Sequence, residues 1–104
     1  MTPEKRIQNK IVDYLNERQA FGAPIFVERR NAGGFSYKKG IPDLYAVING
    51  RHVEIEVKQP GGELEPMQEK FRQKCERLNI TWVCATCVED VSVLVDAILY
   101  EEAL

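Results

Sequence analysis

Apolar residues recur at helical spacing in the first segment of the chain, residues 3–19, which is predicted to form an amphipathic helix. Thr2-Pro3 suits the start of this helix, because threonine caps free backbone N–H groups and proline is favoured at the first helical position. The apolar stripe of the helix comprises Ile7, Ile11, Tyr14 and Leu15. Residues 21–24 contain glycine and proline and are expected to end it.

The middle of the sequence has the patterns of three strands. Residues 25–30, 44–48 and 51–58 contain β-branched and aromatic residues at strand-like spacing. Only Asn49-Gly50 separates the last two segments. This dipeptide between two β-rich runs predicts a hairpin with a two-residue turn.

The C-terminal part returns to helical spacing on either side of a predicted buried strand, residues 80–85. A second helix is expected to open at Glu65-Pro66, and its apolar stripe comprises Met67, Phe71, Cys75 and Leu78. Thr86 and Glu89 fit a capping box for a closing helix. The apolar side of that helix comprises Val91, Leu94, Val95 and Ile98. The order α-β-β-β-α-β-α predicts one α/β domain over residues 1–104, a mixed four-stranded sheet with flanking helices.

Charge is distributed unevenly along the chain. The net charge of −2 argues mildly against a nucleic acid partner. However, residues 1–40 hold eight Lys and Arg against four acidic residues, whereas residues 81–104 hold five acidic residues and no Lys or Arg. A basic half beside an acidic half is compatible with a polyanion bound on one face.

The sequence has no apolar run that approaches the length of a membrane span, so no membrane partner is expected. Its N-terminus leads directly into a charged amphipathic pattern rather than a signal peptide. We therefore expect a cytoplasmic location. In that compartment Cys75, Cys84 and Cys87 are expected to be thiols.

The hairpin brings acidic residues together. A two-residue turn at Asn49-Gly50 places Asp43 directly opposite Glu56, and strand alternation puts Glu54, Glu56 and Lys58 on one face. Opposed carboxylates repel each other unless a cation lies between them. A three-residue turn would shift the register by one residue and weaken this pairing.

A third carboxylate comes from the first helix. Glu4 lies on the apolar stripe, at the end of the face that packs on the sheet. Three converging carboxylates suit Mg²⁺ or Mn²⁺, which prefer oxygen ligands. Lys58 beside them would orient or deprotonate an attacking water, or stabilise a developing phosphate charge.

Each of these residues also has a simpler explanation. Glu4 favours the dipole of its helix, and Asp43 suits a turn. Glu54 and Glu56 are compatible with the solvated face of an edge strand, with Lys58 as their surface ion-pair partner. The convergence of two independent periodicities on one point favours a site.

Pro42-Asp43 followed by Glu56-Val57-Lys58 resembles the PD-(D/E)XK nuclease signature. The surrounding matches are Glu4 and residues 30–34, 39–44, 55–58 and 64–68. Together they resemble the VRR-NUC family, in its short stand-alone form from bacteria and their phages. The resemblance implies a restriction-endonuclease-like fold and hydrolysis of DNA phosphodiester bonds with Mg²⁺ or Mn²⁺.

Residue roles follow from the resemblance position by position. It implies that Asp43 and Glu56 are metal ligands, joined by the backbone carbonyl of Val57. Glu4 is the first-helix acid, a catalytic residue that reaches the metal through water. Lys58 is the catalytic lysine, and a further catalytic residue is the second-helix glutamine, Gln68.

The resemblance also suggests a substrate and an assembly. Single-domain members of the family resemble Holliday-junction resolvases and tend to be homodimers, which implies branched or junction DNA as substrate. The apolar run at residues 91–99 is a candidate dimer contact or, equally, a cover for the sheet. The glycine-rich loop of residues 31–40 is either a flexible connection or, with its flanks, a source of basic side chains for the DNA backbone, which we expect. These are Arg29, Arg30, Lys38 and Lys39.

Two alternatives belong to other functional classes. The fold is compatible with a DNA-binding or assembly module that lacks the chemistry, although such a module has no need of opposed carboxylates. Cys84-x-x-Cys87 would suit a zinc or redox site, but only Cys75 and His52 remain as further zinc ligands. Structural thiols are therefore the preferred interpretation.

Overall fold

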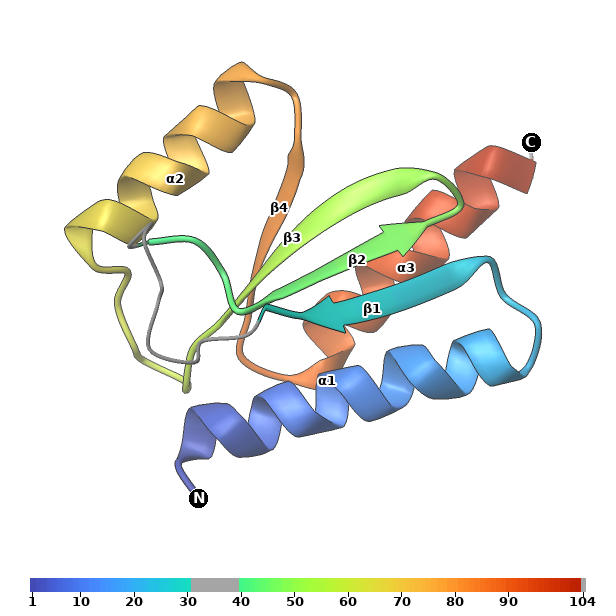
Figure 1. Cartoon of the computed structure of the whole chain (residues 1–104), viewed down its shortest axis with the longest axis horizontal. Coiled ribbons are helices and arrows are strands. Elements are labelled where there is room, and N and C mark those ends of the chain that lie inside the picture. Colours follow the sequence, from blue (N-terminus) through green and yellow to red (C-terminus); the bar gives the residue numbers. More distant parts are fainter. Residues whose placement is uncertain (31–39, 104) are drawn as a thin grey trace.

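A computed structural model describes residues 1–30 and 40–103 and, over that part of the chain, shows the predicted order of elements (Figure 1). Lys38, Lys39 and most of the predicted DNA-binding loop lie outside the described residues. The elements are α1 (Pro3–Ala20), β1 (Ile25–Arg29), β2 (Leu44–Ile48), β3 (Arg51–Val57), α2 (Pro66–Arg77), β4 (Thr81–Ala85) and α3 (Val88–Ala103).

The four strands form one mixed sheet in the order β1-β2-β3-β4. The first two pairings are antiparallel, and β3 pairs with β4 in parallel through the α2 crossover. Asn49 and Gly50 both have positive φ, 49° and 85°, as a two-residue hairpin turn requires. Tyr45 pairs with Glu54, so the predicted register is confirmed. Asp43 lies one residue before β2, at the end of this ladder.

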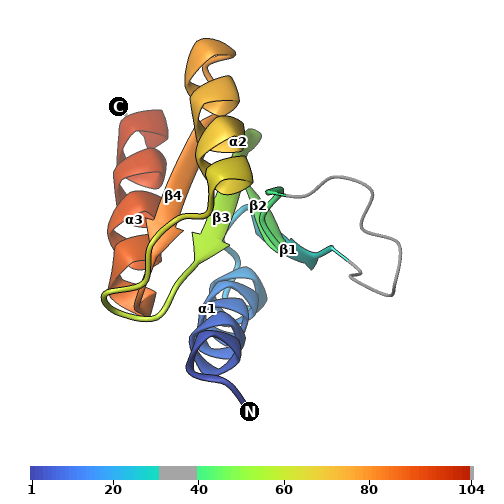
Figure 2. The same ribbon diagram turned by 90° about the vertical axis from the view of Figure 1, so that its left-hand side faces the viewer.

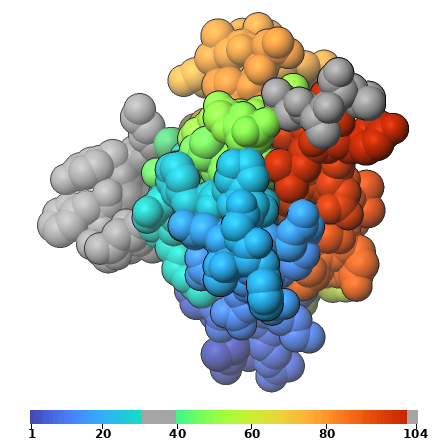
Figure 3. All heavy atoms as spheres, turned by 90° about the vertical axis from the view of Figure 1, so that its right-hand side faces the viewer, coloured from blue at the N-terminus to red at the C-terminus, as the bar shows by residue number. Residues whose placement is uncertain are grey.

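Two of the helices cover one face of the sheet. α1 and α3 lie side by side there, as Figures 1 and 3 show. The apolar side chains of β2 and β3 pack beneath them in a single core. Members with no exposed surface include Ile11, Leu15, Leu44, Ile55 and Val95. Within the described residues, no helix combines the length and apolarity needed to cross a membrane.

β3 occupies the inside of the sheet and is buried on both faces from Val53 to Lys58. Glu54, Glu56 and Lys58 are only 4%, 7% and 8% exposed. The alternative in which the acidic residues form the solvated face of an edge strand is therefore wrong. The edge strands are β1 and β4. Residues 80–85 were expected to form a buried strand, yet in β4 only Ala85 is buried.

α2 packs against β4 (Figure 2) and is less buried than its periodicity predicts. Of its predicted apolar stripe only Cys75 is buried, while Met67 and Leu78 are 46% and 59% exposed. The predicted capping box at the start of α3 is also wrong. Asp90, not Glu89, accepts the hydrogen bond from the backbone N–H of Thr86, at 2.9 Å.

The segment before β2 contacts the backbone of α2 at Gly40. Its φ is +90°, a conformation that favours glycine, and a Cβ placed there would collide with the backbone carbonyl of Met67. The backbones of this segment and of the first turn of α2 therefore pass in close contact. This contact brings Pro42-Asp43 to the same end of the sheet as Gln68.

Gly40→Ala is expected to lower the free energy of unfolding by about 3 kcal/mol, because it adds both a strained φ and a backbone collision. Gly61→Ala is the matched control. Gly61 has a φ of +83° but open space around it, so only the conformational cost of about 1 kcal/mol applies. Urea unfolding of both variants measures the difference, and equal losses would show that the contact with α2 contributes nothing.

Candidate active site

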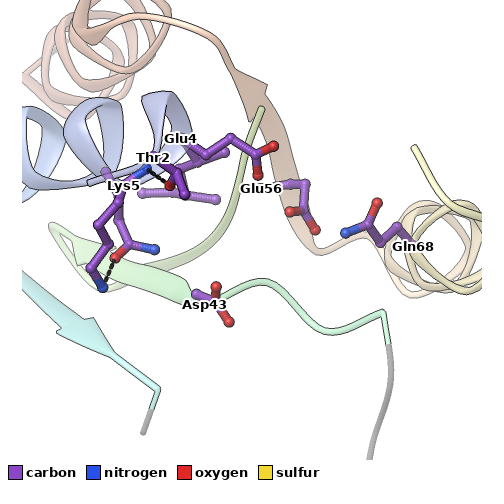
Figure 4. Close-up of a pocket in the computed structure, with 9 residues that line it drawn as sticks. Thr2, Glu4, Lys5, Asp43, Glu56 and Gln68 are labelled. Atoms are coloured by element: carbon purple, nitrogen blue, oxygen red, sulfur yellow. Dashed lines mark hydrogen bonds between the residues drawn. The ribbon is translucent and has the colours of Figure 1, made fainter. Parts of the chain in front are cut away.

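A polar pocket of about 210 Å³ opens between the N-terminal ends of α1 and α2. It lies where β2 begins and β3 ends (Figure 4). Its lining comes from α1 and the residue before it, the residue before β2, the end of β3 and the first turn of α2: Thr2, Glu4, Lys5, Gln8, Asp43, Ile55, Glu56, Val57 and Gln68. The pocket thus brings together five of the residues singled out from the sequence: Glu4, Asp43, Glu56, Val57 and Gln68.

Glu56 is the most perturbed acid of the pocket. Burial, helped by the nearby Asp43, Glu4 and Glu65, raises the pKa of its carboxyl to about 7, although the charge of Lys58 opposes the shift. Figure 4 shows the carboxylates of Glu4 and Glu56 turned toward the same space. Burial and the neighbouring acids therefore outweigh the stabilisation that Lys58 gives to the charged carboxylate.

Lys58 does not line the pocket. It directly follows β3, its backbone N–H donates to the carbonyl of Ala85 at 3.0 Å, and its side chain is buried. Its charge is close enough to lower the pKa of Glu56. The lysine therefore influences the buried acid from beside the pocket.

Gln68 faces Glu56 from the first turn of α2. Its side-chain oxygen accepts from the backbone N–H of Glu65 at 2.8 Å, which caps the helix. Figure 4 shows the other end of the amide, the NH₂ group, turned toward Glu56. The capping bond therefore fixes the side chain with its donor toward the pocket.

Arg30 joins three segments beside the pocket. Its two terminal nitrogens donate to the two carboxylate oxygens of Glu54, each at 2.6 Å, and one of them also donates to the carbonyl of Pro42 at 2.8 Å. Its backbone N–H donates to the carbonyl of Asp43 at 2.7 Å. The arginine thus holds the Pro42-Asp43 segment against β3.

His52 and Tyr45 extend this hydrogen-bonded network around Glu54 and Arg30. Nε2 of His52 bonds at 2.5 Å to Oε2 of Glu54, an oxygen that Arg30 also contacts, and the ring stacks on Tyr45 with centroids 5.0 Å apart. Arg30 lies 4.9 Å from the centre of the Tyr45 ring. Burial raises the pKa of Glu54, but the hydrogen bonds from Arg30 and His52 outweigh it and hold that pKa below its usual value.

Sequence reasoning missed Lys5 and Gln8 as pocket residues. Gln8 is only 7% exposed although it is polar. A signal for it was present, because Gln8, Ile11, Val12 and Leu15 are spaced as one helical stripe. Glu4 lies one turn before Gln8, so the stripe leads from the core directly into the pocket.

The pocket fits a hard cation through oxygen donors. Among the described residues, no three side chains of His, Cys, Asp or Glu converge closely enough to form a ready-made metal site. An ion would therefore rest on Asp43 and Glu56, with backbone oxygen and water completing its shell. The raised pKa of Glu56 supports this fit, since a cation would relieve the repulsion from Asp43 and Glu4.

The cysteines show no zinc site in this part of the chain. Cys75, Cys84 and Cys87 are free, and no third His, Cys, Asp or Glu joins any two of them within the described residues. Burial and the neighbouring Glu56 raise the pKa of the Cys84 thiol. A thiol with a raised pKa is poorly suited to redox chemistry.

Glu56→Gln is expected to stabilise the metal-free protein at pH 8 by about 3 kcal/mol and to have no effect below pH 4.5. The pKa of Glu56 is higher in the folded state than its ordinary value of 4.5, so ionising it costs stability as the pH rises toward 7. Urea unfolding in EDTA at both pH values measures this. The exposed Glu17→Gln is the control, and a pH-independent difference for Glu56→Gln would contradict the buried carboxyl.

Comparison with known proteins rests on structure, because no family model and no curated protein matches the sequence. A solved structure named "VRR_NUC domain" is similar over 92% of this chain and 97% of its own, at 19% identity and a TM-score of 0.71. Another, named "VRR_NUC domain protein", is similar over 92% and 84% of the two chains, at 22% identity and a TM-score of 0.70. At these identities the likeness concerns the fold, and the chain therefore has the nuclease-type, restriction-endonuclease-like fold of VRR_NUC domains.

Proposed function

We propose that this protein is a member of the VRR-NUC family and a metal-dependent DNA endonuclease that uses Mg²⁺ or Mn²⁺. The observation that supports it best is the convergence of Glu4, Asp43, Glu56 and Gln68 on one polar pocket. These residues come from two helices, a strand and the segment before a strand, and they match the nuclease signature position by position. The likeness to VRR_NUC domains supports the nuclease part of the proposal.

In this proposal Asp43, Glu56 and the Val57 carbonyl would hold the metal, and Glu4 would reach it through water. When bound, the ion would neutralise charge at the phosphate and activate a water for attack. Lys58 lies beside Glu56, where its charge favours the ionised carboxylate. It would also orient or deprotonate the attacking water, or stabilise charge that develops on the phosphate.

Gln68 has a positioning part in the proposal. Its oxygen is engaged in capping α2, so its NH₂ group is the end that remains to meet Glu56 or a phosphate oxygen. A neutral donor at this place orients a carboxylate without competing for the metal. Arg30 acts at a greater distance, because it holds the carbonyls of Pro42 and Asp43 rather than the pocket itself.

Cleavage is expected to require Asp43 and Lys58. Asp43→Asn should abolish it, and Lys58→Ala should slow it at least about a hundredfold while DNA affinity stays within a few-fold, because general acid–base groups contribute about 10²–10⁴ in rate. Labelled junction, flap, fork and duplex DNAs with Mg²⁺, Mn²⁺ or EDTA are the substrates. Mobility shifts without metal report binding.

Lys70→Ala, an exposed change on α2, serves as the control for loss of a lysine. Thermal melts establish that each variant is folded. If the unaltered protein bound these DNAs but cut none of them with either metal, the nuclease proposal would be replaced by the non-catalytic DNA-binding module. If Lys58→Ala lost binding and cleavage equally, Lys58 would have no separate part in the chemistry.

We also propose that the protein acts as a homodimer on branched DNA. One chain carries one copy of the Asp43 and Glu56 pair, whereas resolving a junction needs two cuts related by an approximate two-fold axis. α3 was a candidate contact. Its residues Val91, Val95 and Ile98 cover the sheet, but Val93 and Tyr100 are 69% and 67% exposed and lie seven residues apart on one side of the helix.

The protein is expected to have twice its chain mass of 11.9 kDa in solution and to make paired, near-symmetric cuts in a four-way junction. Val93→Lys is expected to weaken the dimer, because it buries a charge in the contact. Light scattering gives the mass, and a cruciform plasmid reports whether both cuts occur in one binding event. Met67→Lys, which alters an exposed apolar residue on α2, is the control. A monomer that only nicks the plasmid would leave a structure-directed nickase.

A further inference from the structure

Two cations meet at one neutral oxygen on the α1 side of the pocket. The Lys5 ammonium donates to Oε1 of Gln8 at 2.9 Å, and the Arg29 guanidinium donates to the same atom at 2.7 Å. Arg29 also donates to Oδ1 of Asn9 at 2.8 Å. The arginine of β1 and the lysine of α1 are therefore held together although they are far apart in the sequence.

The positive charges of this pair are not cancelled. Two cations that share one oxygen lie within about 6 Å of each other, where like charges repel. Among the described residues, neither forms an ion pair with a carboxylate, whereas Arg18, Arg30 and Arg72 all do. Glu4, next to Lys5 in sequence, turns its carboxylate toward Glu56 instead (Figure 4).

Gln8 explains how the cations are held without being neutralised. It is 93% buried at the foot of the pocket, in the helical stripe that leads to the core. A glutamate at this position would form ion pairs with both cations and cancel most of their charge. The amide oxygen orders the same two donors but leaves their charge for a ligand.

The position of the pair relative to the acidic residues indicates what kind of ligand would fit it. Gln8 and Lys5 line the same pocket as Asp43 and Glu56. Figure 4 shows Lys5 and Gln68 at opposite ends of that pocket, with Asp43 and Glu56 between them. An anion at the cation pair would thus lie beside the acidic centre, as a neighbouring phosphate of a bound strand does.

We propose that Lys5 and Arg29, held by Gln8, form a subsite for a DNA phosphate next to the one that is cleaved. The proposal rests on the proposed nuclease function and adds a second point of contact to it. A strand held at this subsite and at the acidic centre is fixed in register, so that one phosphodiester bond meets Asp43 and Glu56. Phosphate contacts of this kind position a strand without reading its sequence.

Binding without metal tests the subsite separately from cleavage. Lys5→Gln and Arg29→Gln are each expected to weaken the binding of a fluorescent DNA junction about tenfold, and to reduce the slope of log affinity against log salt by about one. Lys10→Gln and Arg51→Gln are the controls. They remove the same charge from exposed positions on α1 and at the start of β3, and their effect is expected to stay below about twofold.

Gln8→Glu is the sharper variant, because it keeps both cations and changes only the charge of their acceptor. It is expected to weaken DNA binding about tenfold as well, with an unchanged or higher melting temperature. If the thermal melt shows that Gln8→Glu is unfolded, the test rests on Lys5→Gln, which alters an exposed side chain. Equal losses for Lys5→Gln and Lys10→Gln, or full affinity in Gln8→Glu, would overturn the proposal.

The failures of the two proposals can be told apart. If the unaltered protein cut no DNA, the difference between Lys5→Gln and Lys10→Gln in binding would still establish or overturn the subsite. If cleavage occurred but these variants bound alike, only the subsite would fail. Single methylphosphonate substitutions around the cut locate the phosphate. The substitution at the phosphate that contacts the subsite should weaken binding of the unaltered protein. The Lys5→Gln variant should bind this DNA and the unmodified DNA equally.

Discussion

The bidentate pair between Arg30 and Glu54 is the interaction on which the rest of the pocket depends. Glu54 lies on the inner strand β3 and is almost fully buried, so its charge needs a partner that is itself well placed. The planar guanidinium of Arg30 meets both carboxylate oxygens and still reaches the carbonyl of Pro42. One side chain thereby joins the end of β1, the segment before β2 and the middle of β3.

Glu54 and Glu56 show what such a partner changes. They lie two residues apart on the same face of the same strand, and both are buried. Hydrogen bonds from Arg30 and His52 hold the pKa of Glu54 below its usual value, whereas burial and neighbouring acids raise that of Glu56 to about 7. The first is a structural acid with its charge satisfied. The second has an unsatisfied charge and faces the pocket, which is the behaviour expected of a cation ligand.

Charge is also divided within the pocket itself. The acids gather around Glu56, and the cations Lys5 and Arg29 meet at Gln8 on the α1 side. A phosphodiester strand carries regularly spaced negative charges, so one phosphate could lie at the Lys5 and Arg29 pair while the next lies at the acids around Glu56. The acids would accept a phosphate only if a cation screened their charge. This arrangement is compatible with a chain whose overall charge is −2, because the charges that matter are local.

Local patterns in the sequence determined the elements, the hairpin register and the approach of Glu4, Asp43 and Glu56 to one another, because each follows from a short-range period or turn. Gln68 was indicated only by the family resemblance. The tertiary structure decided which strand is inner, and therefore that Glu54 and Glu56 are buried rather than solvated. It also decided the pairing of Arg30 with Glu54 and of Arg29 with Gln8, which join residues 24 and 21 positions apart. A helical period likewise shows which side of α2 faces the sheet, but not how far its neighbours cover Met67 and Leu78. Such contacts depend on how helices and strands pack in space, and no local period encodes that packing.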